Sequence, residues 1–345
     1  MRAWRKLAPG AGAFLVEDFM PVPLEGELRL AVEAVGICGT DLHIVDWHGG
    51  YEGMVRALPV TLGHEIAARV LAGDGLPPGT RVVVRPSVTC DGACGEGGAD
   101  HEDCCSRRTG LGIYRDGGFA REMTAPFRNC LRVPESTPSH HAALAEPLTV
   151  AHEAVRNAAF KPGDDALVLG PGPIGLGAAL FARDAGAHVT IVGRDDAARL
   201  AIAGRLGFGR CIDTGKRTLA EALAAEQAPV RFSAIIEATG APPVLAAALP
   251  LLAQRGRLVI AGIHPKPVEI DVTRLVREQQ SLIGSYRALV ATWPVVLDWI
   301  TRNPDLVEGL ISARLPLARI TEGFDLMRRR AVAKVIVEPE AGQDG

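Results

Sequence analysis

Hydrophobic and polar positions follow two different patterns along the 345-residue chain, and the change falls near residue 150. Before it, the apolar segments are short and are broken by Gly and Pro. Residues 28–35 (LRLAVEAV) alternate as a strand does, and residues 81–85 form a second strand-like run after a turn at 77–79. This spacing of short strands predicts a β-rich, partly closed first domain.

Beyond residue 150, short β-type runs alternate with stretches rich in Ala and Leu that have helical character. The expected strands are residues 166–170, 189–193, 211–213, 233–237, 258–262 and 282–285. Helices are expected between them, for example at 174–185 and 196–206. Six strands joined by helical crossovers predict a doubly wound parallel sheet, so the fold class is α/β. After residue 286 we expect helices around 293–301 and 320–329 and a strand at 334–337.

A glycine-rich loop joins the first strand of this second pattern to a helix. The loop is GPGPIG, and a GxGxxG motif between a strand and a helix is typical of dinucleotide binding. Gly170 would make the tight turn, Gly172 would let the backbone approach a pyrophosphate, and Gly175 would permit close helix–strand packing. The alternative is a glycine-rich turn without a ligand. The candidate cofactor-binding residues are Gly170, Gly172, Pro173, Ile174 and Gly175, together with Gly193, Arg194, Thr239 and Gly262 at or just after later strands.

Composition narrows the function. The net charge is −3 and aromatic residues make up 5%, so we expect neither nucleic acid nor a membrane as partner. No apolar segment suits a signal peptide or approaches the ~20 residues of a membrane span, which favours a cytoplasmic protein. The seven cysteines are an odd number, and four crowd into residues 90–105, which favours a metal site over a disulfide framework.

A second set of residues has metal-binding chemistry. Cys38 lies in GICGTDLH, His64 and Glu65 lie in GHE, and Glu146 lies in AEPL. A thiolate, an imidazole and carboxylates suit zinc with one position open to water or substrate. Each residue alone is weak evidence, since a lone cysteine is usually a small buried hydrophobe.

Together, the order GICGTDLH, GHE, a cysteine-rich lobe, AEPL and GPGPIG resembles the zinc-containing medium-chain alcohol dehydrogenase superfamily. The resemblance runs from residue 34 to 337, and the closest branches are the sorbitol (polyol), sugar and threonine dehydrogenases. It implies a GroES-like catalytic domain at 1–149 and 286–345, a Rossmann domain at 150–285, and a homodimer or homotetramer. It also implies hydride transfer between a secondary alcohol and NAD(P), a reaction in which zinc lowers the pKa of the alcohol.

Matched position by position, Cys38, His64 and Glu65 correspond to the catalytic zinc ligands of this family. Ala68 stands where the family pattern GHExxG has its glycine, and this change leaves the assignment in place. Glu146 corresponds to the glutamate of the polyol branch, which binds zinc directly or through water, whereas most threonine dehydrogenases have Asp-Pro there. In contrast, LHI followed by Trp47 resembles the HIYxW stretch of threonine dehydrogenases. A polyol or sugar is therefore the leading substrate, and threonine and a non-catalytic nucleotide-binding role are the alternatives.

The proton released from the alcohol needs a path to solvent. Thr40 and His43 offer a hydroxyl followed by an imidazole that titrates near pH 7, and the resemblance implies such a relay. The alternative is that Thr40 caps the helix beginning near Asp41.

The cysteine-rich lobe departs from the family pattern of a structural zinc loop. Cys90 and Cys94 are separated by three residues, Gly97-Gly98 replace the third cysteine, and Cys104-Cys105 follow. Two interpretations stay open: the lobe binds zinc through Cys90, Cys94 and Cys105 with Asp100, His101 or Glu102 as substitute ligand, or the metal has been lost.

Cofactor preference depends on the end of the second strand of the Rossmann pattern. NAD-binding proteins usually have an acidic residue there, which binds the ribose 2′-OH and repels a 2′-phosphate. Gly193 occupies that place and Arg194 follows, which favours NADP. NAD use stays open, because Asp195 or Asp196 could bind a ribose.

Overall fold

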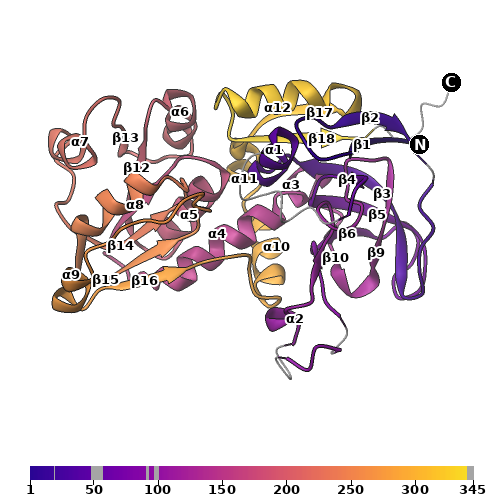
Figure 1. The fold of residues 1–345 in the computed structure, drawn as a ribbon, viewed down its shortest axis with the longest axis horizontal. Coiled ribbons are helices and arrows are strands. Elements are labelled where there is room, and N and C mark those ends of the chain that lie inside the picture. Colours follow the sequence, from indigo (N-terminus) through magenta and orange to yellow (C-terminus); the bar gives the residue numbers. More distant parts are fainter. Residues whose placement is uncertain (19, 48–56, 91–92, 97–100, 340–345) are drawn as a thin grey trace. The chain divides into compact units, whose positions relative to one another are not determined.

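The structure of the chain is a computed structural model that describes residues 1–18, 20–47, 57–90, 93–96 and 101–339. It divides into two compact units (Figure 1). The first comprises Met1–Glu146, Leu289–Arg329 and Lys334–Gly345, and the second comprises Pro147–Ala288 and Arg330–Ala333. These limits differ from the sequence-based domain limits at three places: residues 147–149, 286–288 and 330–333 belong to the second unit.

A seven-stranded sheet forms the centre of the first unit. Its spatial order is β10 (Cys130–Arg132), β6 (Arg81–Val84), β5 (Glu65–Ala72), β3 (Glu27–Gly36), β18 (Lys334–Glu338) and β17 (Ile311–Pro316), with β9 (Glu122–Pro126) also paired to β3. A smaller sheet joins β2 (Phe14–Glu17), β1 (Arg2–Lys6) and β4 (Val60–Thr61), and β7 (Ser87–Val88) pairs with β8 (Thr109–Gly110). The β-rich first domain is confirmed, and the C-terminal strand returns to it as expected.

The central strand β3 sets the position of the residues discussed below. Its residues Leu28, Leu30 and Val32 alternate along the strand and are buried, so they lie on the face of the sheet that is turned to the core. At its carboxyl end Gly36 lies opposite Glu65 of β5 on one side and opposite Ile336 of β18 on the other. Segments separated by about 270 residues therefore meet beside the end of β3.

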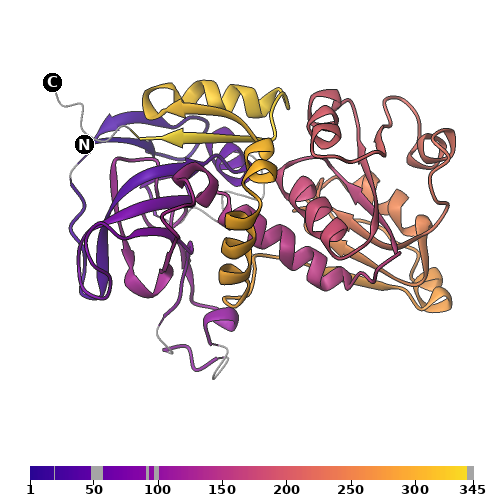
Figure 2. The same cartoon turned by 180° about the vertical axis from the view of Figure 1, so that it is seen from behind.

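Helices cover parts of the first unit (Figures 1 and 2). They are α1 (Gly39–Asp46), α2 (His101–Cys104), α3 (Ser139–Ala142), α10 (Thr292–Arg302), α11 (Pro304–Leu310) and α12 (Ile320–Arg328), with single 3-10 turns at Phe127–Asn129 and Leu317–Arg319. In α12 the ring of Phe324 stacks on Trp4, with 6.0 Å between the centroids, and meets Phe119 edge-on. The returning C-terminal segment is thus packed on the N-terminal strands.

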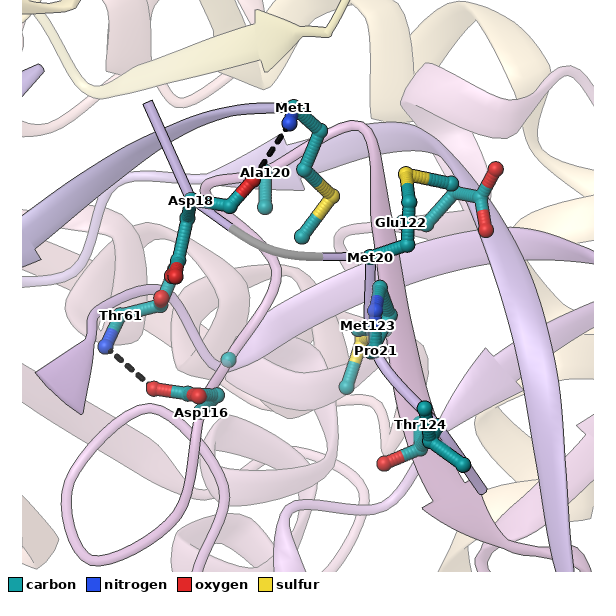
Figure 3. A pocket seen from close by; sticks show the side chains of 12 residues that line it. Met1, Asp18, Met20, Pro21, Thr61, Asp116, Ala120, Glu122, Met123 and Thr124 are labelled. Atoms are coloured by element: carbon teal, nitrogen blue, oxygen red, sulfur yellow. Dashed lines mark hydrogen bonds between the residues drawn. The ribbon is translucent and has the colours of Figure 1, made fainter. Parts of the chain in front are cut away.

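A hollow lies beside the N-terminal strand of the first unit (Figure 3). The amine of Met1 donates to the carbonyl of Asp18 at its rim, and the Thr61 amide donates to an Asp116 carboxylate oxygen 2.7 Å away. Its lining includes three methionines but neither His64 nor any cysteine. The hollow is therefore separate from the metal-ligand candidates.

The second unit contains a six-stranded parallel sheet. Its order is β13 (Cys211–Asp213), β12 (His188–Gly193), β11 (Asp165–Leu169), β14 (Phe232–Glu237), β15 (Leu252–Ile260) and β16 (Ser281–Gly284). Each expected strand is present, and β15 begins six residues earlier than expected, with a break in its register to β14. The chain order reverses between β11 and β14, where a doubly wound sheet binds its ligand.

Helices pack on both faces of the parallel sheet. They are α4 (Ala145–Ala158), α5 (Pro173–Asp184), α6 (Ala197–Arg205), α7 (Leu219–Ala225), α8 (Pro242–Ala248) and α9 (Val272–Glu278), with a 3-10 turn at Leu249–Leu251. Alternate residues such as Leu167 and Ile235 form one core with α7 and α8, and Val168 faces α5 on the other side. Among the described helices, none has the length and hydropathy needed to cross a membrane.

Candidate functional site

Cys38, His64 and Glu65 come together in the first unit. One potential ligand atom from each lies within 4.8 Å of the other two. Cys38 is the last residue before α1, and the other two stand at the start of β5, where His64 and Glu65 are 6% and 1% exposed. The buried Nδ1 atom of His64 has no hydrogen-bond partner among the described residues. A thiol, an imidazole and a carboxylate in this arrangement fit a zinc ion.

Asp41 fixes the two loops that present these ligands. Its fully buried carboxylate accepts the amide hydrogen of Cys38 at 3.0 Å and that of Gly63 at 3.2 Å. It also lies 3.6 Å from His64 Nδ1. Gly63 has φ +92°, and a Cβ there would lie 2.8 Å from the Phe119 ring, so glycine is required before the histidine.

Asp41 was not among the sequence candidates. The sequence feature that could have identified it is an acidic residue three positions after the helix N-cap, as in a capping box. The same geometry excludes the alternative role of Thr40 as the helix cap, because the N-cap is Cys38 and α1 begins at Gly39. Thr40 and His43 instead lie three residues apart on α1 and are both partly exposed, so they share one face of the helix.

Glu146 lies in the first turn of α4, outside the group of three but within its electrostatic reach. Burial raises the pKa of the Glu146 carboxyl to about 7, with a smaller raising effect from Glu65 and lowering effects from His64 and Lys334. The structure thus brings this fourth sequence candidate near the other three.

The charges around the group favour a cation. Burial opposes the protonated form of His64, but the charges of Asp41 and Cys38 hold its pKa well above the ordinary value. Likewise, burial alone would lower the pKa of Lys334, whereas Glu65 and Cys38 raise it. Lys334 also escaped sequence analysis, although a lysine inside the apolar run 332–337 was a visible signal.

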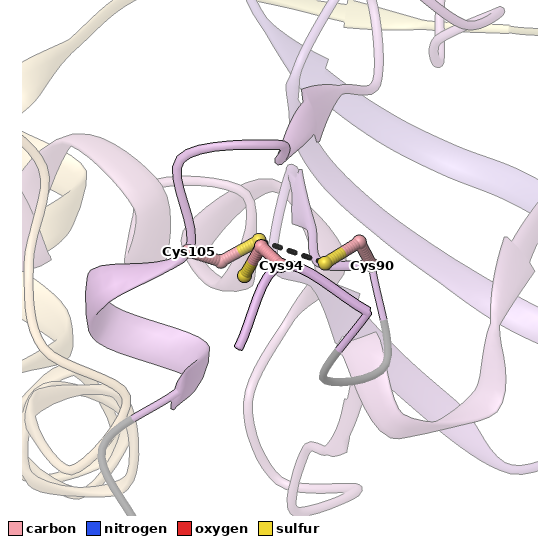
Figure 4. Close-up of side chains that lie close together, drawn as sticks. All are labelled: Cys90, Cys94 and Cys105. Atoms are coloured by element: carbon pink, nitrogen blue, oxygen red, sulfur yellow. Dashed lines mark hydrogen bonds between the residues drawn. The ribbon is translucent and has the colours of Figure 1, made fainter. Parts of the chain in front are cut away.

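Three cysteines of the lobe also converge (Figure 4). The sulfur of Cys105 lies 3.4 Å from that of Cys90 and 3.9 Å from that of Cys94. Burial raises the pKa of the Cys105 thiol, but hydrogen bonds at Cys90 and Arg107 bring it down to about 7. Three thiols this close fit a structural zinc, whose thiolate form they would supply.

The fourth ligand of the lobe is not among the contacts that the structure describes. Glu102 contacts Arg85, with 3.0 Å between carboxylate oxygen and guanidinium nitrogen, so it is already paired. Asp100 lies outside the described residues, as does Gly97-Gly98, and the side chain of His101 is not described.

The glycine loop of the second unit has the geometry expected for a phosphate cradle. Gly170 has φ +99°, and a Cβ on Gly175 would lie 1.9 Å from the Gly170 carbonyl oxygen. A Cβ on Gly172 would meet nothing within 4 Å, so space is left above the N-terminus of α5, which begins with Pro173 and Ile174. A Cβ on Gly170 would lie 2.9 Å from Thr239, which places Thr239 beside this loop.

Glu237, at the end of β14, supports the same edge of the sheet. Its fully buried carboxylate accepts the amide hydrogens of Thr239 at 2.7 Å and of Gly240 at 3.0 Å. The Nε2 atom of His264 lies 2.9 Å from its other oxygen. A Cβ on Gly262 would lie 2.2 Å from the Gly240 amide nitrogen, so Gly262 belongs to this packed edge.

The segment after β12 is held by an acid from the neighbouring strand. The Asp213 carboxylate accepts the amide hydrogens of Asp195 at 2.8 Å and Asp196 at 3.1 Å. Asp196 is buried, with a carboxylate oxygen 3.7 Å from Arg199. A Cβ on Gly193 would lie 3.1 Å from the Asp196 Cβ, whereas Arg194 is exposed.

Comparison with known proteins identifies the family. Residues 24–135 match the alcohol dehydrogenase GroES-like domain, and residues 173–302 match the zinc-binding dehydrogenase family. The chain is 30% identical to L-threonine 3-dehydrogenase of Mesorhizobium japonicum, with 98% of each chain covered. The chain belongs to the zinc-containing medium-chain alcohol dehydrogenase superfamily. The dehydrogenase is also 28% identical to sorbitol dehydrogenase of Halalkalibacterium halodurans, covering 98% of this chain and 99% of the relative.

Solved structures agree with this assignment. The dehydrogenase superposes on 2R,3R-butanediol dehydrogenase from Bacillus subtilis with a TM-score of 0.87 and 27% identity, covering 98% and 99% of the two chains. A zinc-binding dehydrogenase from Sinorhizobium meliloti, solved with NADP, gives 0.85 and 27% over the same shares. The expected GroES-like and Rossmann folds, the oxidoreductase activity on alcohols, and the use of zinc and NAD(P) are therefore confirmed.

We expect two zinc ions per chain, and a substitution at one site should remove only the zinc ion of that site. Cys38→Ser should remove one zinc and nearly all activity, because a candidate ligand is lost, while the second unit still binds the dinucleotide. Cys94→Ala should remove the other zinc and lower the melting temperature, while zinc at Cys38 stays. Metal analysis of the three proteins, with cofactor titration as the folding control, measures this. Wild-type turnover in Cys38→Ser would show that the catalytic site is misassigned, and unchanged zinc in Cys94→Ala would exclude the lobe site.

Proposed function

We propose that the dehydrogenase oxidises a secondary hydroxyl of a polyol or sugar, with zinc held by Cys38, His64, Glu65 and Glu146. The observation that carries this proposal is the convergence of three candidate ligand atoms within 4.8 Å of one another. The Glu146 carboxyl is close enough to interact electrostatically with His64 and Glu65. Zinc in such a site supplies a Lewis acid, and the nicotinamide accepts the hydride. Thr40 and His43, on one face of α1, pass the released proton toward solvent.

The substrate follows from the glutamate at the start of α4. Sorbitol and threonine dehydrogenases are about equally similar to the chain, so overall identity does not separate the two substrates. Glu146-Pro147 matches the polyol pattern, whereas His43 and Trp47 match the threonine pattern. We give more weight to Glu146 because its carboxyl interacts with the ligand group itself.

A substrate panel tests this proposal. We expect the best polyol or sugar to give a kcat/KM at least tenfold above that for L-threonine, because Glu146-Pro147 matches the polyol pattern. Absorbance of the reduced nicotinamide, with each substrate and each cofactor, measures it, and chelator-treated protein is the blank. A preference for threonine of the same size would favour the alternative instead.

We further propose that NADP is preferred over NAD. Gly193 removes the carboxylate that would repel a 2′-phosphate, and the Asp195 and Asp196 amides are already bonded to Asp213. The buried Asp196 side chain points to Arg199, whereas Arg194 and Asp195 are both exposed beside the loop. A guanidinium in that place is suited to a phosphate dianion.

Arg194→Ala should lower kcat/KM for NADP roughly ten- to a hundredfold and change that for NAD little. The reason is the loss of one charge-assisted contact, worth about 1.5–3 kcal/mol. Arg205→Ala, at an exposed arginine of α6 in the same unit, is the matched control and should change neither value. Steady-state kinetics with both cofactors measure the ratio, and a tenfold wild-type preference for NAD would contradict the proposal.

We also propose that the enzyme forms a homodimer or homotetramer through the second unit. Strand β16 is the last strand of the parallel sheet, so one of its edges is open. Beside it, α9 has no buried residue, and its Val272 and Val276 are 58% and 72% exposed. An open edge next to exposed apolar side chains is suited to a second copy.

Val276→Lys should lower the mass in solution, because it places a charge in the proposed interface. Light scattering of the eluting protein measures the mass. Val295→Lys, at a valine of α10 that is 52% exposed in the other unit, should leave it unchanged. A wild type that elutes as a monomer would rule out this proposal.

A cytoplasmic location completes the proposal. All seven cysteines are free thiols in the structure. Five of the residues proposed to hold the two zinc ions are cysteine or histidine (Cys38, His64, Cys90, Cys94 and Cys105), and these bind zinc as reduced thiolates and a neutral imidazole. Thiols persist in reducing compartments. Fractionation of the native host, with detection of the untagged protein, tests the location.

A further inference from the structure

A buried lysine lies directly behind the proposed zinc ligands. The Nζ atom of Lys334 is 2.7 Å from each carboxylate oxygen of Glu65 and 3.0 Å from the carbonyl oxygen of Ile37. The two side chains are 2% and 1% exposed. An ammonium group has three donors, and here each has an acceptor.

This ammonium group joins the segments that supply the ligands. Glu65 begins β5, Ile37 immediately precedes Cys38, and Lys334 begins β18. The space for the contact comes from Gly36, where a Cβ would lie 1.8 Å from a Glu65 oxygen. One side chain therefore restrains both a carboxylate ligand and the backbone that carries the thiol ligand.

We propose that Lys334 is a positioning residue of the zinc centre, which holds Glu65 and the Ile37–Cys38 peptide in the geometry that binds the metal. The proposal rests on the ligand set of the proposed function. Partners that orient metal ligands commonly contribute a factor of ten to a hundred to metal affinity. A buried carboxylate without its counter-ion would also be costly and would turn toward other donors.

Simple electrostatics predicts the opposite sign. A positive charge close to the site repels a dication, so removing it would tighten zinc binding if charge were its only effect. A lysine that only stabilises the fold would leave the zinc affinity unchanged. The direction of the change therefore separates the three roles.

The chain offers a matched control. Lys6 is also fully buried in the first unit, and its ammonium group contacts backbone carbonyls, including those of Gly12 at 2.9 Å and Val45 at 3.5 Å, and lies 4.8 Å from the centre of the Trp47 ring. Lys6→Met and Lys334→Met remove the same charge from equally buried places. Only the second removes a partner of a candidate metal ligand.

The experiment compares zinc dissociation constants of the full-length protein, measured by chelator competition. Lys334→Met should weaken zinc binding ten- to a hundredfold, while Lys6→Met should keep the wild-type value even where it lowers the melting temperature. In a Glu65→Gln background, Lys334→Met should weaken binding less than about threefold, because its partner is already changed. The lobe site contributes equally in every variant, so the differences report the Cys38 site.

Unchanged or tighter zinc binding in Lys334→Met would overturn the inference, as would the same loss in the Glu65→Gln background. If Lys334→Met does not fold, Lys334→Gln, which retains one donor amide, replaces it in the same cycle with the same expected directions. Failure of the proposed function gives a different result: the wild type would then hold no zinc that Cys38→Ser removes.

Discussion

The metal-ligand group depends on strand β3 being paired on both sides. Gly36 at its end faces β5 on one side and β18 on the other, so residues near 37, 65 and 335 must meet. The amide of Ile37 donates to the carbonyl of Val335 at 3.0 Å, which fixes the point where the chain leaves the sheet for Cys38. Because the strands of the sheet pair through backbone hydrogen bonds, the approach of these three segments does not depend on the side chains of the candidate ligands. The sheet therefore brings Cys38, His64 and Glu65 together through backbone pairing, and such preorganisation reduces the ordering cost of metal binding.

The charges around the candidate zinc ligands explain how acidic side chains can be stable in a buried position. The carboxylates of Asp41 and Glu65 and the thiol of Cys38 are held close together where water is scarce, and an uncompensated group of this kind would be unfavourable. The protein compensates part of the charge itself. Asp41 receives two backbone amide hydrogens, and Glu65 receives the ammonium group of Lys334. The charges of Asp41 and Cys38 raise the pKa of His64 despite its burial, so the remaining field still attracts positive charge. A divalent cation is the partner that satisfies it.

The local sequence was sufficient to predict those features of the fold that depend on neighbouring residues. The strand–glycine–helix pattern predicted the loop at Gly170, and short apolar runs between helical stretches predicted the strands of the parallel sheet, because each depends on neighbouring residues. The roles of Asp41 and Lys334 could not be found in this way, since they depend on which strands pair across the chain. Lys334 acts on a residue 269 positions away, and no spacing in the sequence encodes that contact. The loop after β12 shows the same limit: Asp213 holds it through two amides, although it stands at the end of a different strand.

The second unit uses buried acids in the same way as the first. Glu237 accepts the amide hydrogens of Thr239 and Gly240, and Asp213 accepts those of Asp195 and Asp196, so each carboxylate fixes a turn at the edge where doubly wound sheets bind their ligands. A carboxylate such as that of Asp213, which already accepts two backbone amide hydrogens, has fewer lone pairs left for a ribose hydroxyl. In many NAD-binding folds the acid after the second strand is free for the ribose. Here the Asp213 carboxylate stabilises the loop through two amides and the Asp196 carboxylate is buried beside Arg199, while Arg194 and Asp195 are both exposed. Of these two exposed side chains only the guanidinium attracts a 2′-phosphate, so selectivity for NADP would depend on Arg194 outweighing the Asp195 carboxylate.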